Sequence, residues 1–169
     1  MEALLRGRVW KFGDNITTDH IIAVKYLGTT DARVFADHAM ETVDPDFSKK
    51  AKPGDMIVAG RNFGSGSSRE QAPVALKILG IVAVLAESFA RIFYRNSINI
   101  GLPVVECPGI SDAAEEGEVL ELDLAGGVVR VPSGQEKTIT PFPPRVLEIL
   151  TAGGLIPKLK QEAAEKGNL

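Results

Sequence analysis

The centre of the chain, residues 56–105, alternates short apolar runs with segments of helical period. Met56–Ala59, Ile81–Leu85 and Pro103–Val105 have the length and composition of buried strands. The segments between them carry apolar residues three and four positions apart, which is typical of a helix packed on one face. The pattern predicts an α/β fold with a parallel β-α-β-α-β core and right-handed crossovers. Ligands of such units bind beyond the carboxyl ends of the strands.

Glycine, serine and proline residues set the expected limits of the two central helices. Gly80 is typical of a left-handed C-cap and is expected to end the first helix. Ser88 is placed to cap the second helix, which Gly101 stops. A helix that began at Ser67 would carry Pro73 in its second turn. Either the first turn is therefore loose, or the regular helix begins near Pro73.

The flanks of this core have other patterns. Residues 119–124 alternate apolar and polar side chains, and residues 128–131 follow a Gly-Gly turn, which predicts an antiparallel hairpin. Pro144 suits the first position of a helix that Gly153 and Gly154 end, and the polar stretch 158–169 is expected to be a surface helix or frayed. Residues 1 to about 50 predict one strand around Val9–Phe12 followed by irregular polar chain. We place no domain boundary within 1–169.

The composition excludes several classes of protein. The 19 basic and 22 acidic residues give a net charge of -3 without a basic stretch, so nucleic acid is not an expected partner. A single cysteine, Cys107, excludes a disulfide framework, a thiolate zinc site and an iron-sulfur cluster held by this chain alone. The first residues lack a signal-peptide pattern, and no run reaches the roughly 20 apolar residues of a membrane helix. We expect a cytoplasmic protein without a membrane partner or metal site of its own.

The loop Gly64-Ser65-Gly66-Ser67-Ser68-Arg69-Glu70 is the strongest local signal for a ligand site. Its glycines allow a tight turn, and a helix that starts at the serines presents unpaired N–H groups to an anion. Arg69 opposes the helix dipole, and its guanidinium suits a carboxylate, so we predict an anionic ligand. The alternative is structural, because Ser67 and Glu70 also match a capping box. Both interpretations stay open on this loop alone.

Three ligand-binding templates fit this loop incompletely. The lysine of a P-loop is absent, and so is the G-x-S-x-G elbow of a hydrolase. A dinucleotide fingerprint is matched at Gly64 and Gly66, but Arg69 replaces the third glycine. Glu87, about 20 residues on, imitates the acid that binds a ribose. A nucleotide-binding module is therefore the alternative from a different functional class.

Other polar and aromatic residues have structural interpretations beside functional ones. Asp19 and His20 are adjacent, so the carboxylate is placed to orient the imidazole, although a lone histidine in a loop is commonly structural. Cys107 reads as a small buried residue. Arg91 and Arg95 are expected to be solvated surface residues. The alternative is that Arg91 contacts an anion, because it is nearest the helix start. Four aromatic residues are expected in the core: Trp10, Phe12, Phe89 and Phe93.

Three motifs in order, residues 14–20, 60–70 and 86–96, closely resemble the small subunits of the 3-isopropylmalate dehydratase family. These are free-standing counterparts of the swivelling fourth domain of aconitase. The resemblance is close over residues 7–105 and looser over the rest. It implies a single swivelling β/β/α domain over 1–169. It also implies a hydro-lyase that interconverts 2-isopropylmalate and 3-isopropylmalate in leucine biosynthesis, which is a branched-chain amino-acid pathway.

The resemblance also implies roles for individual residues. Ser67 would act as an alkoxide that removes the carbon-bound proton, while Ser68 and Arg69 hold the substrate carboxylate. Asp19, with His20 beside it, would belong to the acid-base apparatus across the pocket. The other substrate-binding positions that it implies are Gly66, Tyr26, Gly28 and Thr29. Helix-start amides and a guanidinium around a serine oxygen agree with this, because an alkoxide needs converging donors in a site closed to water.

A cofactor and a partner follow from the same resemblance. The family uses an open iron of a 4Fe-4S cluster, held by three cysteines, as the Lewis acid that takes the hydroxide. This chain has only Cys107, so it is expected to bind no cofactor itself. The cluster is expected on an iron-sulfur large subunit, in a heterodimer or heterotetramer that acts on a small hydroxy di- or tricarboxylate.

One segment departs from the family pattern. Isopropylmalate enzymes typically read Tyr-Leu-Arg-Thr where this chain has Tyr26-Leu27-Gly28-Thr29. Gly28 has no guanidinium, so a contact that selects the substrate's substituent is either lost or supplied from elsewhere, with Lys25 and Arg33 as candidates. The alternatives are therefore the small subunit of homoaconitase or of 2,3-dimethylmalate dehydratase. A scaffold without a catalytic role is a further, non-enzymatic alternative.

Overall fold

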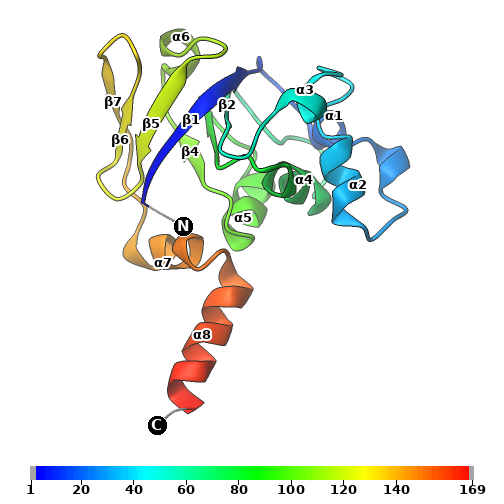
Figure 1. Cartoon of the computed structure of the whole chain (residues 1–169), viewed down its shortest axis with the longest axis vertical. Coiled ribbons are helices and arrows are strands. Elements are labelled where there is room, and N and C mark those ends of the chain that lie inside the picture. Colours follow the sequence, from blue (N-terminus) through cyan, green and yellow to red (C-terminus); the bar gives the residue numbers. More distant parts are fainter. Residues whose placement is uncertain (1–2, 168–169) are drawn as a thin grey trace.

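A computed structural model describes residues 3–167, and its strands form one seven-stranded sheet (Figure 1). The strand order is β4-β3-β2-β1-β5-β6-β7. The bounds are β1 Leu4–Lys11, β2 Met56–Ala59, β3 Ala83–Ala86, β4 Val104–Glu106, β5 Val119–Asp123, β6 Val128–Arg130 and β7 Glu136–Thr138. The predicted parallel core and antiparallel hairpin are both confirmed, and β7 was not predicted.

Strand β1 joins the parallel and antiparallel halves of the sheet. Its second half pairs in parallel with β2, with Val9 opposite Met56, and its first half pairs antiparallel with β5, with Leu4 opposite Asp123. Gly7 lies in the antiparallel half opposite Leu120, where an added Cβ would stand 2.2 Å from the carbonyl oxygen of Gly54. The strand that was expected around residues 9–12 is therefore longer and central in the sheet.

The helices are mostly short, and two of them make the central crossovers. Their bounds are α1 Thr18–Ile21, the 3-10 helix η1 Val24–Tyr26, α2 Ala32–Asp37, α3 Phe47–Lys50, α4 Gln71–Leu79, α5 Arg91–Asn99, α6 Ile110–Ala113, α7 Pro144–Thr151 and α8 Leu155–Gly167. Helices α4 and α5 follow β2 and β3, and α2 packs against α4 (Figure 1). Every residue of β2 and β3 is buried, so the core lies between these strands and the helices.

Several expected boundaries are confirmed and others are wrong. Gly80 ends α4 with φ 104°, and Pro144 occupies the first turn of α7. Helix α4 begins at Gln71, which places Pro73 in its first turn and leaves Ser67 outside the helix without a capping role. Ser88 does not cap α5, because its Oγ instead accepts a hydrogen bond from the Asn62 amide at 2.8 Å.

The N-terminal region also differs from the expected irregular chain. Residues 18–50 form α1, η1, α2 and α3, each of three to six residues. Such helices are too short to show a helical period, and their signal lies in caps such as Thr17 and Asp31. At the other end, α8 extends away from the rest of the molecule as a surface helix (Figure 1). The expected tail at 168–169 lies outside the described residues.

Among residues 3–167, no helix has both the length and the apolar character that crossing a membrane requires.

Candidate functional site

The serine loop, residues 60–70, lies directly against residues 13–18. It leaves the carboxyl end of β2 and leads into α4, as predicted from the topology. Asp14 Oδ1 also accepts a hydrogen bond from the Arg61 amide at 2.7 Å. Three main-chain bonds join the segments: Asn15 N to Arg61 O (2.8 Å), Gly64 N to Ile16 O (2.7 Å) and Thr18 N to Ser65 O (2.8 Å). Two motifs separated by about 45 residues of sequence therefore form one structural unit.

Left-handed residues shape both segments of this unit. Asn15 and Asn62 have φ values of 56° and 58°, and Asn62 Nδ2 donates to Asn15 Oδ1 at 3.2 Å. Asparagine tolerates this conformation better than most side chains. Gly64 has φ 83°, and a Cβ there would lie 2.1 Å from Cγ of Phe93. The tight turn predicted from the glycines is confirmed, and Gly64 is required for packing as well as for backbone geometry.

Arg69 and Asp19 form an ion pair between the serine loop and α1. The side chain of Arg69 is 17% exposed, whereas that of Asp19 is 61% exposed. The guanidinium is thus held within the protein surface with its carboxylate partner on the solvent side. The structure brings together two residues that the sequence analysis assigned to opposite sides of a pocket. A charged fork in this position is suited to a second carboxylate from a ligand.

The serines of the loop are accessible. Gly66, Ser67 and Ser68 are exposed, and neither serine hydroxyl has a hydrogen bond to another described residue. The main chain between them is constrained, because the Arg69 amide donates to Ser67 O at 2.9 Å. Both hydroxyls therefore lie where a ligand can reach them, on the two residues that precede Arg69 in the loop.

His20 is oriented by Thr17 rather than by Asp19, so the expected Asp19–His20 orientation is wrong. The Thr17 amide donates to His20 Nδ1 at 2.9 Å, and the His20 amide donates to Thr17 Oγ1 at 3.2 Å. This reciprocal capping box fixes the start of α1. Because Nδ1 accepts the amide hydrogen, the neutral ring carries its proton on Nε2. Asp19 is left to pair with Arg69.

Thr18 is a polar residue of this site that the sequence analysis did not single out. It is only 2% exposed, and its Oγ1 is buried without a hydrogen-bond partner among the described residues. That oxygen lies 3.5 Å from the position of a Cβ on Gly66. A buried hydroxyl facing a glycine turn leaves one unused donor directly beneath the serine loop.

The segment around Tyr26 holds the other substrate-binding positions that the family resemblance implies. Gly28 is exposed, and an added Cβ would meet nothing within 4 Å. Thr29 Oγ1 accepts a hydrogen bond from the Asp31 amide at 3.1 Å. The two cations proposed as substitutes for the missing guanidinium are both paired: Lys25 lies 3.8 Å from Glu41, and Arg33 lies 3.1 Å from Asp37. Arg33 is thus paired within α2, and Lys25 is paired with Glu41 in the turn after α2.

Glu87 is engaged inside the protein and does not offer a free acid to a ribose. Its carboxylate accepts hydrogen bonds from the Gly109 amide at 2.7 Å, the Ser111 amide at 3.0 Å and the Ser111 hydroxyl at 2.6 Å. Burial alone would raise the pKa of Glu87, but these donors outweigh burial and hold the pKa below its ordinary value. The feature that favoured a nucleotide-binding module is therefore a structural one.

Cys107 and the aromatic residues have the structural roles expected of them. Cys107 is buried, and burial raises the pKa of its thiol to about 11. Among residues 3–167, no group of three or more His, Cys, Asp or Glu side chains is arranged to hold a metal ion. One buried thiol does not fit a cluster that needs three cysteine ligands. Trp10, Phe12, Phe89 and Phe93 all belong to the core.

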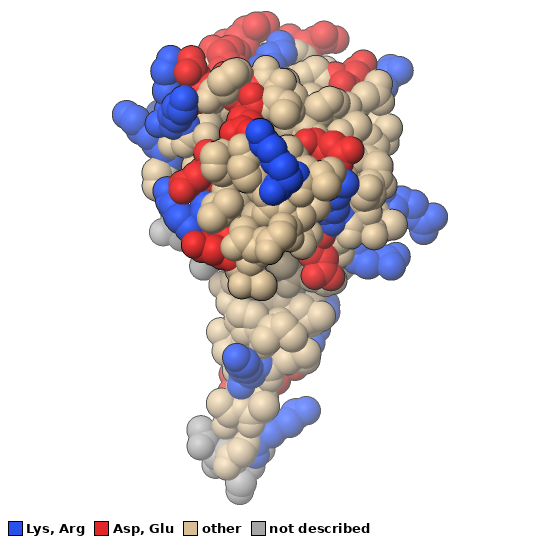
Figure 2. Space-filling view, turned by 90° about the vertical axis from the view of Figure 1, so that its right-hand side faces the viewer, with Lys and Arg blue, Asp and Glu red and all other residues tan. Residues whose placement is uncertain are grey.

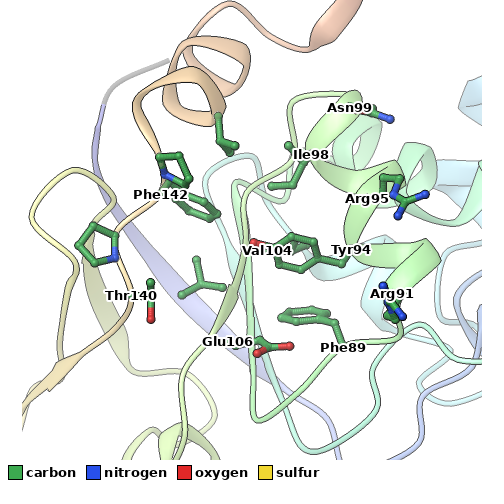
Figure 3. Close-up of a pocket in the computed structure, with 14 residues that line it drawn as sticks. Phe89, Arg91, Tyr94, Arg95, Ile98, Asn99, Val104, Glu106, Thr140 and Phe142 are labelled. Carbon is green, nitrogen blue, oxygen red and sulfur yellow. The ribbon is translucent and has the colours of Figure 1, made fainter.

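Arg91 and Arg95 are exposed and border a separate hollow of about 590 Å³ beside β4 and α5 (Figure 3). Its wall includes the side chains of Phe89, Tyr94 and Phe142, and none of its lining residues belongs to the serine loop. On the face that Figure 2 shows, acidic and basic side chains are interspersed.

Comparison with known proteins places this architecture in a family. Residues 9–108 match the model of the aconitase C-terminal domain. A 3-isopropylmalate dehydratase small subunit from Halothermothrix orenii is 56% identical over 160 residues, which cover 92% of this chain and 95% of the relative. An isopropylmalate/citramalate isomerase small subunit from Methanocaldococcus jannaschii is 52% identical over 166 residues, covering 98% and 99%.

A solved structure agrees with the fold. The crystal structure of a 3-isopropylmalate dehydratase from Methanocaldococcus jannaschii superimposes with a TM-score of 0.91 at 44% identity, and the match covers 98% of each chain. The expected swivel-domain fold is confirmed by this likeness and by the family match. The chain belongs to the aconitase C-terminal domain family.

Proposed function

We propose that the chain is the small subunit of 3-isopropylmalate dehydratase, which interconverts 2-isopropylmalate and 3-isopropylmalate by dehydration and rehydration. The observation that carries this proposal is the accessible Ser67, two residues before Arg69, in the loop that the Arg69–Asp19 ion pair joins to α1. The names of the relatives support the substrate. In this role the enzyme serves leucine biosynthesis in the cytoplasm.

Ser67 is the base that removes the proton from the substrate carbon. A serine hydroxyl ionises far above neutral pH, so its alkoxide needs positive charge and N–H donors around the oxygen. Arg69 supplies the charge, and Ser68 with the main chain of Gly66 supplies polar contacts to the substrate carboxylate. Asp19 holds the guanidinium in place, and His20 fixes the start of the helix that carries Asp19.

The departing hydroxide needs a Lewis acid that this chain does not hold, since its residues do not fit a 4Fe-4S cluster. We assign that cluster to a large subunit, which closes against the serine loop in a heterodimer or heterotetramer. The isolated small subunit is accordingly expected to be inactive.

Gly28 supports a second version of this proposal, in which the enzyme accepts a broader range of substrates. Gly28 has no side chain and is surrounded by open space, so no cation stands where the family pattern has arginine. The relative from Methanocaldococcus jannaschii is named for both isopropylmalate and citramalate. Acceptance of a smaller aliphatic malate is therefore the favoured variant, ahead of homoaconitate and 2,3-dimethylmalate.

Reconstitution with a cluster-bearing large subunit tests the proposal. The assembled complex should dehydrate 2-isopropylmalate, measured by absorbance of the unsaturated product, while the small subunit alone shows no turnover. Citramalate, homoaconitate and 2,3-dimethylmalate complete the substrate panel. Turnover by the cluster-free chain at an enzymatic rate would overturn the assignment of the Lewis acid to the large subunit. A saturable thermal shift with NAD or ATP, together with an inactive complex, would favour the nucleotide-binding alternative.

A further inference from the structure

A second cluster of titratable side chains lies outside the serine loop, where η1 meets the turn after α2. The rings of Tyr26 and His38 stack with centroids 3.9 Å apart and planes at 10°. Glu41 accepts a hydrogen bond from the Tyr26 hydroxyl, and its other oxygen lies 2.7 Å from His38 Nδ1. Lys25 Nζ lies 3.8 Å from the same carboxylate. One carboxylate thus connects three side chains from two segments.

The turn that carries Glu41 has a conformation that favours glycine. Met40 has φ 60°, although it has a long side chain, and that side chain is fully buried. The Met40 amide donates to Ile21 O at 2.9 Å, which ties the turn to the end of α1. Left-handed non-glycine residues persist only where the surrounding structure holds them, and they concentrate at functional sites. The turn therefore has a fixed attachment from which Glu41 reaches η1.

The segment Tyr26–Thr29 has few attachments of its own. The main-chain hydrogen bonds of Tyr26 and Leu27 close only the single turn of η1, on Ala23 and Val24. Gly28 is exposed. Tyr26 and Leu27 pack partly against the core, and the hydroxyl of Tyr26 reaches across to Glu41, fifteen positions along the chain.

The ionisation states support this connection. Burial would raise the pKa of Glu41, but hydrogen bonds from Tyr26 and His38 outweigh it and lower the pKa. The hydrogen bond to Glu41 raises the pKa of Tyr26. At neutral pH the carboxylate therefore accepts and the phenol donates.

We propose that Glu41 is a positioning residue for substrate specificity. By holding Tyr26 and His38, it fixes the segment Tyr26–Thr29 as the wall that meets the aliphatic substituent of the substituted malate. This inference rests on the proposed function, for which the family resemblance implies Tyr26, Gly28 and Thr29 as substrate-binding positions.

Glu41→Gln in the reconstituted complex tests it. The amide keeps the size of the side chain but removes the charge and one acceptor. KM for 2-isopropylmalate should rise about tenfold while kcat changes less than about threefold, because the base Ser67 is untouched. The ratio of kcat/KM for 2-isopropylmalate over citramalate should fall at least about fivefold, because a loosened wall discriminates less.

Two further variants sharpen the test. Glu162→Gln is the matched control, since Glu162 pairs with Arg145 and Lys158 around α8, and it should change neither KM nor the substrate ratio. Tyr26→Phe deletes only the hydroxyl and should shift KM in the same direction. Combined with Glu41→Gln it should add little, because both remove the same contact. If Glu41→Gln prevents assembly, Tyr26→Phe decides alone.

The outcomes are separable. An active wild-type complex whose Glu41→Gln and Tyr26→Phe variants keep both KM and the substrate ratio would overturn the inference alone. A wild-type complex that is inactive on every malate would overturn the proposed function and this inference with it.

Discussion

The serine loop and the Tyr26–Thr29 segment are held in different ways. Main-chain hydrogen bonds and a glycine packed against Phe93 fix the serine loop. The Tyr26–Thr29 segment is joined to the turn after α2 by side chains that meet at Glu41, and Gly28 within it has free space around it. Main-chain contacts depend little on side-chain identity, whereas side-chain contacts change with each substitution. In the proposed function, the region held by its main chain carries the chemistry and the region held by side chains carries the choice of substrate.

The largest expected effect tests the chemical half of this comparison. Ser67→Ala in the assembled complex should lower kcat about 10³-fold, because general base catalysis contributes on that order. KM should change little, since Ser68 and Arg69 stay in place. Steady-state kinetics measure both values, with Ser133→Ala on the exposed loop before β7 as the control. Unchanged kcat would mean that the chain is only a scaffold.

Two glycine substitutions compare the rigidity of the regions directly. Gly64→Ala should destabilise the protein by about 3 kcal/mol, because it combines overpacking with an unfavourable backbone conformation. An added Cβ there would lie 2.1 Å from Phe93 at φ 83°. Gly28→Ala, with nothing within 4 Å, should change the free energy of unfolding by less than about 0.5 kcal/mol. Urea denaturation measures both, and equal effects would contradict the comparison.

Arg69→Lys tests whether the planar guanidinium of the serine loop is needed or whether its positive charge is sufficient. Lysine keeps the charge but loses the planar pair of donors, so kcat/KM should fall about 30-fold. Arg130→Lys is the control, because Arg130 is exposed and pairs only with Glu136 among the described residues. A loss of less than about threefold would show that a point charge is sufficient.

The smallest expected effect concerns the pH dependence of the loop that follows β3. The pKa of Glu87 is lowered in the folded protein, so its contribution to stability is present above its unfolded pKa and is lost as pH falls through the folded value. Glu87→Gln should therefore cost about 1 kcal/mol at pH 7 and less at pH 3. Urea denaturation at both values checks this, with the exposed Glu165→Gln as the control. A pH-independent loss would point to packing alone.

The sequence predicted the parallel core, the hairpin and the glycine turn because each has a local signature. Apolar runs mark β2 and β3, Gly80 and Pro144 mark helix ends, and Gly64 marks the turn. Three-residue strands such as β7 and helices as short as α1 carry no periodic signal.

The unpredicted parts of the site depend on contacts between distant segments. The Arg69–Asp19 pair joins residues 50 positions apart, and Ser88 binds Asn62 instead of capping its own helix. Met40 has a left-handed backbone conformation and a fully buried side chain. Methionine does not favour this conformation, so the local sequence does not predict it. Pairing across loops is decided by tertiary packing, which local propensity does not encode.

The Arg69–Asp19 pair makes the resting site internally neutralised. A substrate carboxylate that approaches the guanidinium meets a counterion already in place, so binding becomes an exchange of one anion for another. Asp19 is the more exposed partner, so it can turn toward water as the ligand arrives. Under the proposed function, exchange of this kind weakens the capture of stray anions such as phosphate or chloride, and it releases the Asp19 carboxylate from Arg69 when the substrate is bound.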